Sequence, residues 1–166
     1  IILGNHIRRG NAELEYILEN KIPFISCPQL VQFLFPDSKY RIVVAGTHGK
    51  STTTSLLGWI LFEAGLNPTV LIGAKSVNFE NSFHVGSKDL LVIEGDEYTS
   101  SCLDNTSKFL YYNPTHTVIT SIELDHMDVF DTWEKQIDTF EKLAMSTTGT
   151  LLLCGDTLSE IAQQLK

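Results

Sequence analysis

From residue 41 onward, apolar residues come in short continuous runs, and stretches with helical spacing separate these runs. Continuous runs of Val, Ile and Leu are typical of strands that are buried on both faces of a parallel sheet. The strands predicted from these runs are 41–45, 69–72, 89–94, 108–112, 117–122 and 150–154. The helices predicted between and after them are 50–64, 132–145 and 158–165. This alternation predicts a mostly parallel, doubly wound α/β sheet, in which ligands bind at the carboxyl ends of the strands.

The first part of the chain has its own pattern, and a polar segment at 36–39 with the helix-stopping Pro36 is predicted to end it. The elements expected before this boundary are a strand at 1–3, a basic loop between glycines at 4–10, a helix at 11–20, a strand at 23–26 and a helix from about Pro28. We interpret residues 1–37 as the tail of a Rossmann-like α/β domain. The chain begins at Ile1 without a Met, which suggests a segment of a longer protein.

The sharpest chemical motif lies between the strand at 41–45 and the helix at 50–64. Its predicted phosphate-binding residues are Gly46, Thr47, His48, Gly49, Lys50, Ser51 and Thr52. Glycines let the backbone turn so that successive N–H groups point at an anion, and the helix N-terminus adds partial positive charge. Lys50 is expected to reach the β- and γ-phosphates and Ser51 to bind Mg²⁺, while His48 is a candidate to face substrate. Val44 replaces the first glycine of the usual P-loop, so a plain helix N-terminus with Lys50 in solvent stays the alternative.

Acidic side chains follow two of the predicted strands. Glu94 ends the strand at 89–94, and a carboxylate beside a phosphate loop is suited to Mg²⁺, which prefers oxygen ligands. Asp96 and Glu97 follow it, and for them a solvated acidic turn is an equal alternative. His126 lies among three carboxylates after the strand at 117–122. It is a candidate to ligate a second metal, orient a nucleophile or move a proton, with an exposed polar loop as the alternative.

Composition narrows the classes of protein that fit. Hydrophobic residues make up 43% of the chain, which excludes a disordered chain, a collagen and a disulfide scaffold. The net charge of −8 argues against broad nucleic-acid binding and against an anionic membrane surface. Membrane insertion is not expected, because no apolar run approaches the ~20 residues that cross a bilayer. The three scattered cysteines predict reduced thiols in a cytoplasmic protein.

The three motifs, in this order, resemble those of the Mur ligase family, the ATP-dependent amide-forming ligases of peptidoglycan synthesis. The run A-G-T-H-G-K-S at 45–51 is similar to that family's phosphate loop, which also lacks the first glycine. E-G-D-E at 94–97 and E-L-D-H-M-D at 123–128 resemble the family's E-A-D-E and D-H-M-D segments. Softer segments at 4–11, 22–29 and 107–114 most resemble the branch that returns a tripeptide to UDP-N-acetylmuramate in cell-wall recycling.

This resemblance implies that residues 1–37 end a UDP-sugar-binding domain, that residues 38–166 form an incomplete ATP-binding central domain, and that a C-terminal domain is absent. It implies a cytoplasmic enzyme of peptidoglycan metabolism, and hence of cell shape and division, that uses ATP and Mg²⁺. The reaction would join the carboxylate of UDP-N-acetylmuramate to the amine of L-Ala-γ-D-Glu-meso-diaminopimelate through an acyl phosphate, releasing ADP. The alternatives are L-alanine as the amine donor and, from a different class, a non-catalytic P-loop nucleotide-binding module.

The resemblance also assigns roles to residues. Lys50 and His126 would be catalytic, and Ser51, Glu94 and His126 would hold metal ions. The further candidates for substrate binding are Asn5, Arg8, Arg9, Asp96 and Glu97. For the two arginines, which match phosphate geometry, surface solubility is the alternative.

Overall fold

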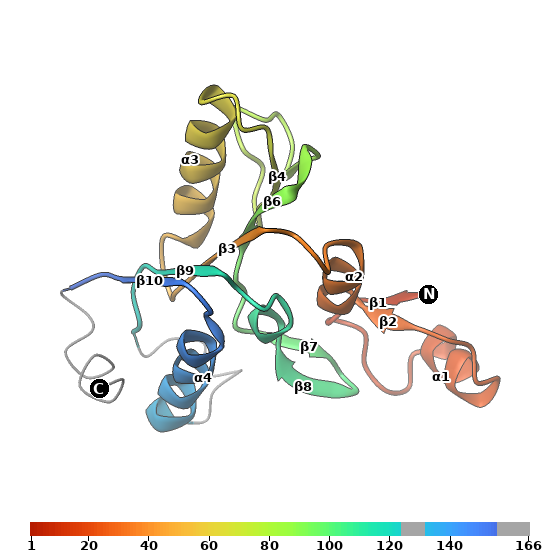
Figure 1. Ribbon diagram of the computed structural model, residues 1–166. Coiled ribbons are helices and arrows are strands. Elements are labelled where there is room, and N and C mark those ends of the chain that lie inside the picture. Colours follow the sequence, from red (N-terminus) through yellow and green to blue (C-terminus); the bar gives the residue numbers. More distant parts are fainter. Residues whose placement is uncertain (124–131, 156–166) are drawn as a thin grey trace.

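A six-stranded sheet forms the centre of the computed structural model, which describes residues 1–123 and 132–155 (Figure 1). Its strands, in spatial order, are β10 (Thr150–Leu153), β9 (His116–Ile119), β3 (Tyr40–Ala45), β6 (Ser87–Glu94), β4 (Pro68–Leu71) and β5 (Phe83–His84). The neighbours from β10 to β4 are parallel, and β5 runs antiparallel to β4. The predicted class, a mostly parallel α/β sheet, is therefore confirmed.

Helices cover both faces of this sheet. Helix α3 (Lys50–Glu63) packs against β3, β4 and β6, where Val92 joins the smaller apolar cluster. Leu91 and Ile93 belong to the larger cluster, together with Phe109 of the 3₁₀ helix η1 (Lys108–Tyr111) and Phe140 of α4 (Trp133–Ser146). Successive residues of a strand point to opposite faces, so the continuous apolar run of β6 serves both layers.

The N-terminal elements pack against the rest of the chain. Strand β1 (Ile2–Leu3) pairs in parallel with β2 (Ile25–Ser26), and α1 (Ala12–Glu19) connects the two. Helix α2 (Cys27–Leu34) begins with a capping box formed by Ser26 and Gln29 and contributes Val31 to the larger core cluster. The hydroxyl of Ser100 donates a 2.6 Å hydrogen bond to Ser26 Oγ from the hairpin of β7 (Thr99–Ser101) and β8 (Asp104–Ser107). Elements on both sides of the segment at 36–39 thus share one core.

Two predicted strands differ from the structure, and one predicted helix lies outside the described residues. The strand predicted at 108–112 is wrong, because residues 108–111 form η1, and both Phe109 within it and Tyr112 directly after it are buried. A short apolar run does not distinguish a buried strand from a buried helical turn. The strand predicted at 117–122 ends at Ile119. The helix predicted at 158–165 lies outside the described residues.

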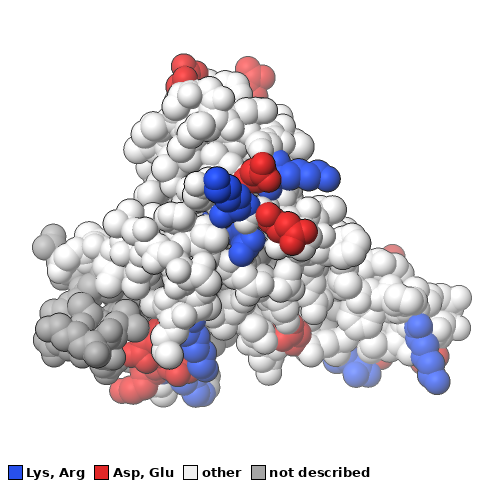
Figure 2. Space-filling view, in the orientation of Figure 1, with Lys and Arg blue, Asp and Glu red and all other residues white. Residues whose placement is uncertain are grey.

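Charged side chains are spread over the surface seen in Figure 2, with both signs close together and large uncharged areas between them. Among the described residues, no helix combines the length and the apolar character that crossing a membrane requires.

Candidate phosphate-binding site

The loop between β3 and α3 lies at the carboxyl edge of the sheet, where the chain changes direction across it. From β3 the chain passes through α3 to β4 and β6 on one side, and β9 lies on the other side of β3. Such a switch point is where open α/β sheets bind ligands. The predicted loop, strand end and helix start are therefore brought to the place that the sheet topology favours for an anion.

Only glycine fits at position 46, because a side chain would clash with neighbouring atoms and because the backbone has a positive φ. Its φ is +133°, and a Cβ built there would lie 2.3 Å from Thr120 Oγ1 and 2.8 Å from the carbonyl oxygen of Ser121. Gly49, the N-cap of α3, has a φ of +80°. Both values favour glycine, because a Cβ is strained at these angles.

Replacing Gly46 with Ala is expected to lower the free energy of unfolding by about 2–4 kcal/mol, since backbone strain and a steric clash act together. Chemical denaturation followed by circular dichroism measures this loss. Gly65→Ala is the matched control, because Gly65 also has a positive φ of +78° but open space around it. An equal loss in both variants would contradict the role of the close contact with Thr120.

The amides of the loop do not all point at the expected anion. The N–H of Thr47 donates to the Ser121 carbonyl at 2.8 Å, and the N–H of His48 donates to Ser121 Oγ at 3.0 Å. The expectation that successive loop amides converge is thus wrong for these two residues. The amides of Lys50, Ser51 and Thr52 open α3, and first-turn amides have no partner within a helix, which suits them to an anion.

Thr120 and Ser121, directly after β9, contact the loop, and the sequence interpretation did not include them among the site residues. Thr120 Oγ1 donates to the carbonyl of His48 at 2.5 Å, while Ser121 holds the two amides described above. On the other side of the loop, Thr47 Oγ1 accepts the N–H of Glu123 at 2.9 Å. The sequence feature that could have identified them is a pair of hydroxyl side chains directly after a buried strand. These contacts fix the loop against β9 and so hold its shape.

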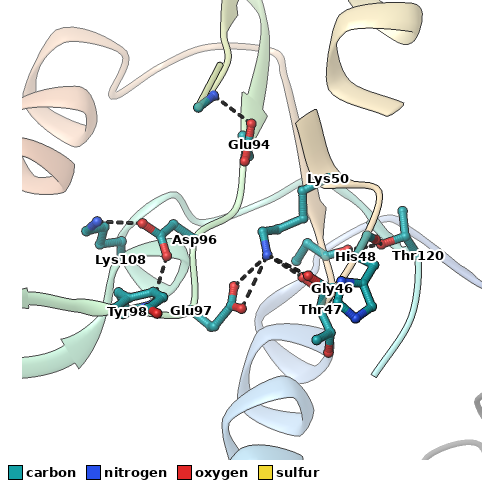
Figure 3. A network of polar contacts seen from close by, with 12 residues as sticks. Gly46, Thr47, His48, Lys50, Glu94, Asp96, Glu97, Tyr98, Lys108 and Thr120 are labelled. Atoms are coloured by element: carbon teal, nitrogen blue, oxygen red, sulfur yellow. Dashed lines mark hydrogen bonds and ion pairs between the residues drawn. The ribbon is translucent and has the colours of Figure 1, made fainter. Parts of the chain in front are cut away.

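Lys50 lies at the centre of the polar network in Figure 3. Its Nζ donates to the carbonyl oxygens of Gly46 at 2.7 Å and Thr47 at 3.2 Å, and to Glu97 Oε1 at 3.2 Å. Glu97 has an exposed fraction of 0%, so the solvated turn considered from the sequence is wrong for this carboxylate. Burial raises the pKa of Glu97, and the charge of Lys50 opposes that rise.

Glu94 and Ser51 meet beside the loop, as expected from the sequence. Ser51 Oγ donates to Glu94 Oε1 at 3.0 Å, and the N–H of Gly73 donates to Glu94 Oε2 at 2.6 Å. The Gly73 contact fixes the carboxylate so that it faces the start of α3. A hydroxyl and a carboxylate next to phosphate-binding amides are the oxygen ligands that Mg²⁺ prefers, so the residues present fit this ion.

A cleft of about 360 Å³ adjoins Glu94 and separates the N-terminal elements from the turn after β6. Asn5, Cys27, Glu94, Asp96, Ser100, Lys108 and Tyr112 are among its lining residues. Lys108 Nζ pairs with Asp96 Oδ2 at 2.5 Å, which provides both signs of charge at the cleft wall. Burial raises the pKa of Tyr112, so its hydroxyl stays neutral there. Two predicted substrate residues, Asn5 and Asp96, are thereby brought to one cleft beside the metal candidates.

Comparison with known proteins gives the family of this fold and site. A model of the Mur ligase middle domain matches residues 44–165, which is most of the chain. The chain belongs to the Mur ligase family. Val44, which stands where the usual P-loop has its first glycine, is here a fully buried residue of β3.

Two curated relatives represent two branches of the Mur ligase family. The chain is 42% identical over 131 residues to the UDP-N-acetylmuramate–L-alanyl-gamma-D-glutamyl-meso-2,6-diaminoheptandioate ligase of Escherichia coli, covering 79% of this chain and 29% of that protein. It is 34% identical over 158 residues to the UDP-N-acetylmuramate–L-alanine ligase of Endomicrobium trichonymphae, covering 94% of this chain and 33% of that protein. The chain thus spans about a third of the length of these relatives.

Solved structures of Mur ligases have the same fold. The UDP-N-acetylmuramate:L-alanyl-gamma-D-glutamyl-meso-diaminopimelate ligase from Neisseria meningitides superposes with a TM-score of 0.87 at 34% identity, over 98% of this chain and 53% of that chain. The UDP-N-acetylmuramate-alanine ligase from Thermotoga maritima gives a TM-score of 0.78 at 21% identity, over 94% of this chain and 35% of that chain. At that identity the second likeness shows the fold alone.

The remaining predicted side chains of this Mur ligase chain do not join the contacts around Lys50 and Glu94, or they lie outside the described residues. Arg8 and Arg9 are exposed; Arg8 donates to the carbonyl of Asn5, and Arg9 pairs with Glu15 at 2.9 Å. The side chain of His48 is exposed, with Nε2 3.8 Å from Glu123 Oε2. His126 falls in the range 124–131 and stays a prediction. In the described part of the chain, no cluster of three or more His, Cys, Asp or Glu residues forms a metal site.

Proposed function

We propose that this chain is the ATP-binding part of an ADP-forming amide ligase that joins UDP-N-acetylmuramate to the amine of L-Ala-γ-D-Glu-meso-diaminopimelate in peptidoglycan recycling. The observation that carries the proposal is the contact of Ser51 with Glu94 at the start of α3, directly after Lys50 and beside a cleft that Glu94 lines, in a chain 42% identical to a ligase named for these two substrates. Residues 1–37 would end the UDP-sugar-binding domain, and residues 38–166 would belong to the ATP-binding domain. Three scattered thiols and no membrane-crossing helix among the described residues support a place in the reducing cytoplasm.

The loop and Lys50 supply the electrostatic part of the proposed reaction. Transfer of a phosphoryl group depends mainly on positioning and on neutralising charge, and the amides at the start of α3 do both for phosphate oxygens. Ser51 and Glu94 would hold Mg²⁺, which supplies further neutralisation of the phosphate charge when bound. Thr120 and Ser121 keep the loop in shape, so these donors need little reorganisation.

The cleft supports a place for the acid substrate. Glu94 lines it and also contacts Ser51, so a carboxylate bound there lies close to the phosphate loop. In the proposed sequence a carboxylate oxygen attacks the γ-phosphorus, ADP leaves, and the amine then attacks the acyl carbon and expels phosphate. His126 keeps its predicted role near the carboxylate, where a second metal ion would reduce the repulsion between two anions.

The L-alanine ligase is the second candidate, because the relative of that branch covers 94% of this chain at 34% identity. A competition assay separates the two candidates. The full-length protein is given ATP and UDP-N-acetylmuramate with equal amounts of L-alanine and the tripeptide, and the products are separated by mass. The tripeptide product is expected to dominate. Dominant L-alanine product assigns the other branch, and ATP hydrolysis that needs neither UDP-N-acetylmuramate nor an amine indicates a nucleotide-binding module of another class.

A further inference from the structure

The Lys50 ammonium has three N–H donors, and three acceptors in the protein surround it. The carbonyl oxygens of Gly46 and Thr47 lie 2.7 Å and 3.2 Å from Nζ. The carboxylate of Glu97 is the third partner, with Oε1 and Oε2 each 3.2 Å from Nζ (Figure 3). A phosphate that binds Lys50 must therefore displace one of these three contacts.

Glu97 is the partner that an incoming phosphate most resembles. Like the phosphate, it carries negative charge, whereas the two carbonyl groups are neutral and belong to the loop itself. Its side chain is fully buried, while the Lys50 side chain keeps 14% of its surface exposed. The ammonium thus lies between an interior carboxylate and the open side of the loop.

Glu94, three residues earlier, is placed differently. Its two oxygens bind the Ser51 hydroxyl and the Gly73 amide, away from Lys50. In Figure 3, Glu94 and Glu97 lie apart from each other, and Lys50 lies between the loop and Glu97. The metal candidates and the Lys50–Glu97 pair are therefore separate groups of contacts within one site.

We propose, resting on the proposed function, that Glu97 is a placeholder anion: it holds Lys50 at the loop until a triphosphate takes over the ammonium. Lys50 keeps its contacts with the Gly46 and Thr47 carbonyls and exchanges only the carboxylate for phosphate oxygens. Glu97 is then a positioning residue, since it acts on the nucleotide through Lys50.

The exchange has a free-energy cost, because separating a buried carboxylate from the cation it contacts is unfavourable. Lys108, the next lysine along the chain after Glu97, is already paired with Asp96 at 2.5 Å. The negative charge of Asp96 beside Glu97 adds to the cost. Glu97 therefore lowers the affinity for nucleotide while keeping Lys50 ordered in its absence.

The test is the affinity of the full-length protein for ATP with Mg²⁺, measured by isothermal titration calorimetry. Glu97→Gln keeps the shape and one acceptor oxygen but removes the charge, so ATP is expected to bind about tenfold more tightly. Glu97→Asp keeps the charge and is expected to stay within about twofold of the unaltered protein. A merely structural role for Glu97 predicts weaker binding in the Gln variant. Asp138→Asn, which removes an exposed ion pair with Lys142, is the control and should change nothing.

A second measurement does not depend on any variant. A structure of the unaltered protein with a non-hydrolysable ATP analogue is expected to show Lys50 Nζ on the phosphates and more than 4 Å from Glu97. An intact pair at 3.2 Å, or unchanged or weaker ATP binding by Glu97→Gln, overturns the placeholder role. If the unaltered protein binds ATP in these cases, only this inference fails. If it binds no ATP at all, the proposed function fails with it.

Discussion

Replacing Lys50 with Ala is expected to reduce nucleotide turnover by the full-length protein at least about 1,000-fold. The ammonium contacts two carbonyl oxygens of the loop, and its loss removes charge stabilisation that matters most in the transition state. ADP release in the presence of UDP-N-acetylmuramate and an amine measures the effect. Retained turnover would count decisively against the assignment of this loop.

The same substitution also affects folding, because it leaves the Glu97 carboxylate buried without its cation. Removing one partner of a buried ion pair lowers the free energy of unfolding by about 3–5 kcal/mol. The double variant Lys50→Ala/Glu97→Gln is the matched control, since it removes both charges. It should recover most of the lost stability and none of the turnover, which separates catalysis from folding.

The stability of Lys50→Ala is expected to depend on pH in a defined direction. Burial raises the pKa of Glu97, and Lys50 opposes this, so the substitution raises that pKa further. A carboxyl group with a raised pKa in the folded state binds its proton more tightly there than in the unfolded chain. The tighter binding of this proton stabilises the folded state fully at pH values below the usual glutamate pKa. The stabilisation is lost as pH rises through the raised pKa of the folded state. Urea unfolding should therefore show the gap between the single and double variants widening from pH 5 to pH 8. A constant gap contradicts this explanation.

Replacing Glu94 with Gln is expected to lower turnover by about 100–1,000-fold, equivalent to about 3–4 kcal/mol of transition-state stabilisation. The amide oxygen still accepts the Gly73 N–H and the amide nitrogen still reaches Ser51 Oγ, so the fold is preserved. The lost charge weakens the proposed Mg²⁺ site, so the Mg²⁺ concentration for half-maximal rate should rise.

Asp89→Asn is the matched control for this experiment, since Asp89 is an exposed acid at the other end of β6. It should leave both the rate and the Mg²⁺ requirement unchanged. A Glu94→Gln variant with full rate and an ordinary Mg²⁺ requirement would remove Glu94 from the metal site.

The parts of the site that the sequence predicted are local. Gly46, Lys50 and Ser51 follow a strand and open a helix within seven residues, so their meeting depends only on short-range structure. Glu94 was predictable because parallel strands end at the same edge of a sheet. The apolar runs likewise predicted the strands that became β3, β6 and β9.

The parts that were missed depend on contacts between distant segments. Ser121 binds the amides of Thr47 and His48 only because β9 pairs with β3 in one register. Glu97 is buried in the turn after β6, to which η1 is bonded through the N–H groups of Lys108 and Phe109. No local pattern distinguishes Glu97 from Asp96, which stays partly exposed. The error at 108–112 has the same origin, since the burial of Phe109 and Tyr112 is fixed by packing against α2 and α4.

The most direct test of the proposed chemistry follows one oxygen atom. UDP-N-acetylmuramate labelled with ¹⁸O in its carboxylate is incubated with the full-length protein, ATP, Mg²⁺ and the tripeptide, and the released phosphate is analysed by mass spectrometry. Attack of the carboxylate on the γ-phosphorus, followed by displacement by the amine, transfers one carboxylate oxygen to each phosphate. Phosphate carrying one ¹⁸O is the predicted result. Amide product formed together with unlabelled phosphate would contradict carboxylate activation at the Lys50 loop.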